Sequence, residues 1–267
     1  MNTKIKIFIL SIAIAGLLSS CEENKGYYNQ RPTYSGYVAF EYTSEAINFY
    51  SSSLSTALMF NMYYSQPTEA KRDSIDKLYF MNTKILREDN GHSWTLRNIY
   101  NGMYYGDISI TTNGKALNDD GAKWTITFPN PSIYELGVTI FDIERIEDGR
   151  WSIKKHENRN YDFEYSSEWE MRSANIEKGF TIEGNGSMLS FATPKLKLDF
   201  TITEPLEITF DEYYTFISTG MINILATDVD KNITEETSAE VLSEYSVRIS
   251  HKNKAEDWDY STFRWWR

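Results

Sequence analysis

The sequence predicts an all-β fold, mainly an antiparallel meander, with one N-terminal helix packed on it. From Leu78 to Ser250 apolar residues recur at every second position, and turn residues separate the runs. This period is typical of strands with one buried face. No second helical pattern of crossover length separates the runs, which argues against parallel βαβ units. The 19 Tyr, 14 Phe and 7 Trp residues also favour strands. The pattern leaves open whether the meander closes into a barrel or forms a two-sheet sandwich.

The one predicted helix covers about residues 44–65. Ser44 is placed to cap its start, and Pro67 lies just beyond its end. The stretch contains no Lys or Arg, so it lacks the basic polar face of a helix that lies on a membrane. Packing against the sheet is therefore favoured. The apolar face consists of side chains spaced three or four residues apart: Ile47, Tyr50, Leu54 and Leu58.

Short turns separate the predicted strands. Asp148-Gly149, between two alternating runs, is a strong hairpin signal. Gly184-Asn185-Gly186 is interpreted as a further turn. Alternation is clearest from Leu196 to Ile202. Because no segment between Leu78 and Ser250 has the composition of a linker, residues 37–267 are predicted to form a single domain.

The N-terminal segment carries an export signal. Lys4 and Lys6 precede an apolar run from Ile7 to Leu18, which is too short to span a bilayer as a helix. The run ends in Leu18-Ser19-Ser20-Cys21, which resembles the lipobox of bacterial lipoproteins. The resemblance implies that residues 1–20 are a signal peptide and that Cys21 carries the lipid that holds the protein at a membrane. Residues 21–36 then form a flexible tether.

Two weaker patterns bear on location. Glu22 and Glu23 directly follow Cys21 and resemble the surface-export signal of Bacteroidetes lipoproteins. Asp73-Ser74-Ile75 fits the O-glycosylation pattern of exported proteins of that phylum. Together with the lipobox, these resemblances imply an outer-membrane protein that faces the cell exterior.

Charge and cysteine content exclude several partners and chemistries. Residues 1–20 hold two Lys and no acidic residue, so their removal takes the net charge from −11 to −13. An acidic chain of this kind argues against nucleic-acid binding, which requires clustered Lys and Arg. Cys21 is the only cysteine, so the mature domain has neither a disulfide nor a thiol nucleophile.

Paired carboxylates are the sharpest enzymatic option. Asp142, Glu144 and Glu147 lie at i, i+2 and i+5 of a predicted strand. Residues at i and i+2 share a face about 6.6 Å apart, near the separation used in glycoside hydrolysis. The spacing resembles the Glu-x-Asp-x-x-Glu strand of β-jelly-roll glycosidases, with Asp and Glu exchanged at the first two places. Glu168 and Glu170 offer a second pair. The alternative is an ordinary polar strand face.

No local sequence signature indicates a metal or a cofactor. Asp228, Asp230 and Asn232 have the spacing that opens a calcium loop, but Ile233 and Ala239 stand where that loop needs Gly and Glu. A solvated acidic loop is the favoured interpretation. The three histidines, His92, His156 and His251, are far apart and are expected at the surface or in turns. Motifs for zinc binding, for nucleotide binding and for a Ser-His-Asp nucleophile elbow are all missing.

Aromatic side chains suggest a binding site. The C-terminal residues Trp258, Tyr260, Trp265 and Trp266, together with Tyr104 and Tyr105, are the candidate sugar-stacking platforms. Their alternative role is core and cross-strand packing. The resulting hypothesis is a surface lipoprotein that binds a carbohydrate or a partner protein without catalysis. A glycoside hydrolase-like enzyme and a structural component of the cell envelope are the alternatives.

Overall fold

The structure is a computed structural model, and it describes nine segments of the 267-residue chain: 31–79, 84–87, 91–100, 105–128, 139–159, 163–173, 179–190, 195–210 and 215–259. Within them, helices α2 (Tyr34–Tyr64) and α3 (Glu69–Tyr79) precede the strands. The strands are β1 (Lys84–Arg87), β2 (Ser93–Tyr100), β3 (Tyr105–Thr112), β4 (Lys123–Phe128), β5 (Thr139–Glu147), β6 (Arg150–Arg159), β7 (Phe163–Arg172), β8 (Gly179–Ser190), β9 (Leu196–Phe210), β10 (Thr215–Asp228), β11 (Ile233–Ser243), β12 (Ser246–His251) and β13 (Lys254–Asp259).

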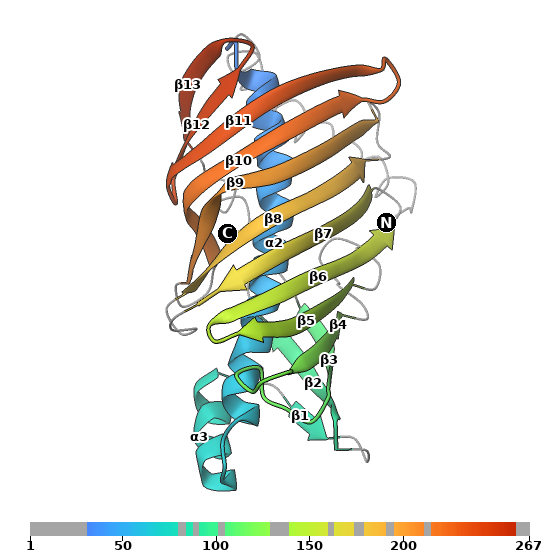
Figure 1. Cartoon of the computed structure of the whole chain (residues 1–267), viewed down its shortest axis with the longest axis vertical. Coiled ribbons are helices and arrows are strands. Elements are labelled where there is room, and N and C mark those ends of the chain that lie inside the picture. Colours follow the sequence, from blue (N-terminus) through green and yellow to red (C-terminus); the bar gives the residue numbers. More distant parts are fainter. Residues whose placement is uncertain are drawn as a thin grey trace, which may run out of the picture.

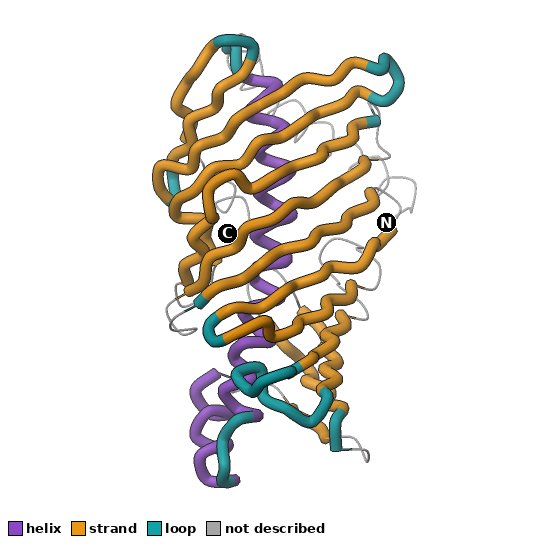
Figure 2. The backbone as a smooth tube through the Cα atoms, in the orientation of Figure 1, coloured by secondary structure: helices purple, strands orange, loops and turns teal. Residues whose placement is uncertain are grey.

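All described strands belong to one sheet. Its order runs from β1 to β13 without a crossover, and every neighbouring pair is antiparallel. The predicted antiparallel meander is therefore confirmed. The sheet curves around α2, which runs along its inner face from β12 and β13 towards α3 (Figures 1 and 2). Among the described residues β1 and β13 do not pair, so the sheet is open, and neither a closed barrel nor a two-sheet sandwich is formed.

Helix α2 begins earlier than predicted. It starts at Tyr34 rather than at Ser44, so residues 34–36, assigned above to the tether, are its first turn. Ser44 is an interior residue whose hydroxyl donates to the Glu41 carbonyl oxygen. Gly36 lets this turn approach the sheet, because a Cβ there would lie 2.9 Å from the His251 Cβ. Tertiary contact therefore overrides the weak helix propensity of this segment.

The apolar face predicted for this helix forms the centre of the core. Ile47, Leu54 and Leu58 are fully buried against the sheet. Most of the turn from Leu54 to Asn61 is buried on all sides. Such burial fits a helix enclosed by a curved sheet better than one lying on a flat surface. One connected cluster includes side chains from α2 and from most of the strands.

Two local features differ from the sequence prediction. Helix α3, which was not predicted, follows Pro67 and extends beyond the sheet (Figure 1). Gly184-Asn185-Gly186 is not a turn but the middle of β8. Gly184 has φ +129°, and a Cβ there would lie 2.2 Å from the Glu168 carbonyl oxygen. Only glycine fits this close approach of β8 to β7. The Asp148-Gly149 hairpin between β5 and β6 is confirmed.

Candidate functional site

A continuous row of polar residues crosses the outer face of the sheet. Each strand from β2 to β12 contributes one member, and each member is the register partner of the next. Hydroxyl, amide, carboxylate and ammonium groups thus stand side by side along the sheet. The inner face one residue away is mainly apolar and includes Trp94, Trp124 and Phe141. The row consists of Ser93, Thr111, Thr125, Asp142, Lys154, Glu168, Asn185, Thr201, Asn223, Ser238 and Ser250.

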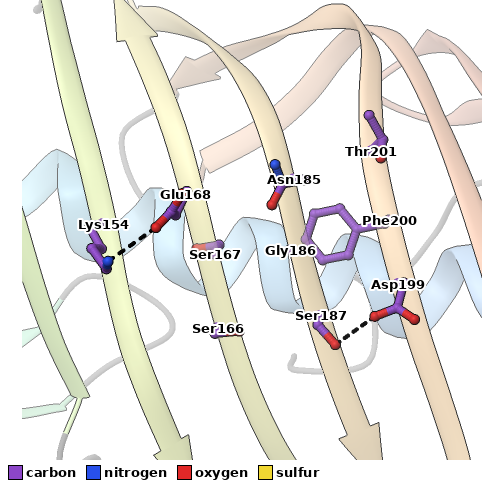
Figure 3. Close-up of a pocket in the computed structure, with 10 residues that line it drawn as sticks. All are labelled: Lys154, Ser166, Ser167, Glu168, Asn185, Gly186, Ser187, Asp199, Phe200 and Thr201. Atoms are coloured by element: carbon purple, nitrogen blue, oxygen red, sulfur yellow. Dashed lines mark hydrogen bonds and ion pairs between the residues drawn. The ribbon is translucent and has the colours of Figure 1, made fainter.

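The row passes through a shallow trough on β6 to β9 (Figure 3). The trough has a volume of about 470 Å³. At one side Lys154 Nζ lies 3.1 Å from Glu168 Oε1. At the other, the Ser187 hydroxyl donates to Asp199 Oδ1 at 2.8 Å. The trough therefore presents both charges and both hydrogen-bonding roles. Its lining residues are Lys154, Ser166, Ser167, Glu168, Asn185, Gly186, Ser187, Asp199, Phe200 and Thr201.

Asn185 and Thr201 are register partners at the centre of the trough. Both are exposed, and neither side chain bonds to another residue of the described chain. An amide supplies donors and an acceptor, and a hydroxyl supplies one of each role. These two side chains are therefore free to bond a polar ligand.

Glycine forms the floor of the trough. A Cβ at Gly186 would lie 2.3 Å from the Phe200 Cζ atom, because the Phe200 ring covers this point of β8. Phe200 is 2% exposed and belongs to the core. The ring is therefore unavailable for stacking, and the trough offers polar contacts only.

The predicted carboxylates lie on the outer face and are tied to separate partners. Asp142 accepts a 2.7 Å hydrogen bond from the Thr125 hydroxyl. Glu144 pairs with Lys123 Nζ at 2.7 Å, and Glu147 pairs with Arg150 Nη1 at 3.0 Å. The structure does not bring the three together in a cleft. An acid/base residue needs a pKa near the working pH, which burial commonly provides.

Both members of the second carboxylate pair, Glu168 and Glu170, also form ion pairs. Glu168 pairs with Lys154 as described, and Glu170 accepts hydrogen bonds from Arg150, including one of 2.6 Å from Nη2. Arg150 lowers the pKa of Glu170 to about 2, and Arg172 acts in the same direction. A carboxylate held in its charged form is a poor general acid.

Trp258 is a core residue and not a sugar platform. Its ring is 3% exposed and stacks on Tyr37 with centroids 4.4 Å apart. The Arg31 guanidinium lies over its ring, 3.7 Å from the centroid. Its indole N–H donates to the Thr33 hydroxyl at 2.9 Å. The core alternative therefore holds for this residue. The other predicted aromatics fall outside the residues whose side chains the structure describes: Tyr104, Tyr105, Tyr260, Trp265 and Trp266.

In the candidate calcium loop, Lys231 already binds the carboxylate of Asp228. Asp228 accepts bonds from the backbone N–H of Lys231 at 3.0 Å and from its Nζ at 2.7 Å. These bonds lower the pKa of Asp228. Asp230 Oδ2 accepts instead from the Lys195 backbone N–H, and Asn232 has φ +55° at the turn. Across the described segments no group of three metal-ligating side chains gathers.

One further prediction and one finding concern the membrane. Cys21 lies outside the described residues, so its lipidation stays a prediction. No helix in the described part of the chain is long and apolar enough to cross a bilayer.

The central residues of the trough were missed by sequence reasoning. Asn185 was assigned to a turn, and Thr201 was only a polar position in an alternating strand. The alternation of β9 was visible, but the register that joins it to β8 depends on the Gly184 irregularity. Comparison of the chain with protein-family models, with curated proteins and with solved structures gave no significant match.

Proposed function

We propose that this protein binds carbohydrate without catalysis, on the outer face of its sheet, while lipid on Cys21 holds it at the outer membrane facing the exterior. The observation that carries the binding proposal is the pair of unengaged side chains, Asn185 and Thr201, in a trough with ion pairs and hydroxyls around it. Sugars carry closely spaced hydroxyls that both donate and accept, and these match amide and hydroxyl side chains.

The polar row favours an extended ligand. Neighbouring strands are about 4.8 Å apart, so successive sugar rings of one chain can bond to successive strands. No exposed ring lines the trough, so affinity rests on hydrogen bonds exchanged with water, each contributing about 0.5–1.5 kcal/mol. We therefore expect modest affinity that increases with oligosaccharide length. The glycoside hydrolase-like alternative is not favoured, because each candidate carboxylate has its own partner on an open face.

The test is calorimetric titration of the full-length protein in detergent with a panel of neutral and acidic oligosaccharides. Asn185→Ala and Thr201→Val are each expected to weaken binding by about 2- to 10-fold, the range of one lost hydrogen bond. Thr111→Val is the matched control, because Thr111 is an exposed threonine of the same row on β3, outside the trough.

Two outcomes contradict the carbohydrate proposal. One is a flat response across the panel, which leaves a partner protein or a structural role in the envelope as the remaining functions. The other is an equal loss in Thr111→Val and Thr201→Val, which removes the trough as the site.

The anchor has a separate test. Cys21→Ser removes the thiol that the lipobox resemblance assigns to lipid attachment. The variant is expected in the soluble fraction after cell lysis, whereas the wild type sediments with membranes. A variant that still sediments with membranes contradicts the anchor.

A further inference from the structure

A second polar cluster lies where the first turn of α2 meets β11 and β12. The Ser35 hydroxyl oxygen lies 2.9 Å from His251 Nε2. Ser35 is exposed, whereas the His251 side chain is 1% exposed. This corrects the expectation that His251 lies at the surface or in a turn. The two residues are 216 positions apart, so no local sequence motif predicts the pair.

The other imidazole nitrogen fixes the ring. His251 Nδ1 lies 3.1 Å from the Glu236 carbonyl oxygen and 2.9 Å from the Thr237 hydroxyl oxygen. A carbonyl oxygen only accepts, so a proton on Nδ1 satisfies this contact. Nε2 is then free to accept from Ser35. A nucleophile beside a base that a third group orients is the arrangement of nucleophilic catalysis.

A carboxylate also lies near Nε2. Glu235 Oε2 lies 3.3 Å from Nε2, and its other oxygen pairs with Lys252 Nζ. A hollow of about 740 Å³ on β11 to β13 is lined in part by Glu235, His251 and Lys252, so it gives a substrate room beside the imidazole of the pair.

The first turn also supplies donors for an oxyanion. Within the described chain the N–H groups of Ser35 and Gly36 have no backbone partner, as is usual for the first turn of a helix. They carry the positive end of the helix dipole. Backbone N–H groups beside a nucleophile stabilise the negative oxygen of a tetrahedral intermediate.

We propose that Ser35 and His251 form a hydrolytic dyad for short-chain carboxylic esters, an activity separate from carbohydrate binding in the trough. Ser35 Oγ bonds to the ester carbonyl carbon as its proton passes to His251 Nε2. The bond to the alcohol oxygen then breaks, and Nε2 returns the proton to the departing alcohol. Water attacks the acyl group with His251 again as base, which releases the carboxylic acid and restores the Ser35 hydroxyl.

The test uses the full-length protein, a fluorophosphonate probe and p-nitrophenyl acetate. Peptide mass spectrometry is expected to place the phosphonyl group on Ser35, after loss of fluoride. Ser35→Ala is expected to abolish this adduct and to lower ester turnover by at least about 100-fold, the usual contribution of a positioned proton acceptor and its nucleophile. Ser74→Ala is the matched control, because Ser74 is also an exposed helical serine, and its hydroxyl bonds only to its own helix.

His251→Gln tests the base. It is expected to suppress labelling of Ser35 while the melting temperature shows whether the buried site stays folded. If that variant unfolds, Ser35→Ala decides alone, because an exposed side chain can be shortened without loss of the fold. The proposal is overturned if folded wild-type protein gives no adduct on Ser35, or if Ser35→Ala keeps the wild-type turnover. In either case the pair is a structural contact between α2 and the sheet.

Discussion

The two ends of α2 are held by different kinds of interaction. At its start, the Thr33 hydroxyl donates to Glu256 and accepts from the Trp258 indole N–H. At its end, Phe60 lies edge-on to Trp94 and Trp124 with centroids 5.6 and 5.8 Å away. The first end is a set of directional bonds, and the second is an aromatic cluster.

The sequence separation of the partners differs as well. Thr33 and Glu256 are 223 positions apart, whereas the end of α2 meets strands that follow it closely along the chain. Contacts close in sequence cost less loop-closure entropy and form earlier in folding. The aromatic end is therefore expected to form first. Burial of its rings is also expected to give it most of the stability, whereas the polar end fixes where the finished sheet stops. Arg31 and Tyr37 contribute to that role by donating to carbonyl oxygens of β13.

The largest effect is expected at Phe60. Its side chain is fully buried, so Phe60→Ala removes the ring at the centre of the aromatic end and leaves a cavity. Such truncations cost about 3–5 kcal/mol of unfolding free energy. Chemical denaturation measures the change, and Tyr42→Ala, at a half-exposed position of the same helix, is the control. A loss below about 1 kcal/mol at Phe60 would contradict the assignment of stability to this end.

A smaller effect is expected at Asn61, the polar residue of the aromatic end. Its Oδ1 atom accepts a buried 2.7 Å bond from the Leu117 N–H, and the Leu117 carbonyl accepts from the Trp151 indole. Asn61→Ala leaves the Leu117 N–H unsatisfied, at a cost of about 1–3 kcal/mol. Chemical denaturation measures the loss of unfolding free energy. Faster exchange of the Leu117 amide shows that the loss arises at this hydrogen bond. The exposed neighbour Asn118→Ala serves as control, and equal losses in both variants would remove the role given to this bond.

The sequence predicted the fold better than the ends of α2. Alternation and turn residues were enough to predict an antiparallel meander, because the alternation of apolar and polar residues along each strand shows which of its faces is buried. The start of α2 was missed because Gly36 and its aromatic neighbours are weak helix formers. Contact with His251 and Trp258 holds them in a helix. These partners lie more than 200 positions away, so a local sequence pattern cannot predict the contact.

The candidate sites were harder to predict than the fold for the same reason. Asp142, Glu144 and Glu147 have a suggestive spacing, but their neighbours on β4 and β6 decide that each is paired. Asn185 and Thr201 become adjacent only through the register of β8 with β9. The sequence shows how residues are spaced along one strand, whereas these sites depend on which residues lie side by side on neighbouring strands.

The third prediction concerns the polar end. Thr33→Val keeps the shape of the side chain and removes the hydroxyl that joins Glu256 to Trp258. The indole N–H is then buried without a partner, and we expect a loss of about 1–2 kcal/mol. Thr68→Val, at an exposed position near the other end of α2, is the control. If Thr33→Val costs more than Phe60→Ala, the division of stability between the two ends is reversed.

The smallest effect is expected from acid, and it distinguishes the two ends most directly. The Thr33 hydroxyl and the Arg31 guanidinium hold the pKa of Glu256 below its ordinary value, so its contribution is present above about pH 4.3 and is lost as the pH falls further. Because this side chain is partly exposed, we expect less than about 1 kcal/mol.

Amide exchange at matched pH values is the measurement. Glu256→Gln keeps an acceptor for Thr33 and cannot titrate. Glu170, whose pKa is also lowered, titrates in both proteins. The difference in exchange between wild type and variant therefore reports the titration of Glu256 alone. Exchange in the first turn of α2 and in β13 is expected to rise below pH 4.3 in the wild type only. Exchange around Phe60 is expected to respond equally in both proteins, because the aromatic contacts there carry no carboxylate. A wild-type excess at Phe60 would show that acid acts on the whole fold and not on its polar end.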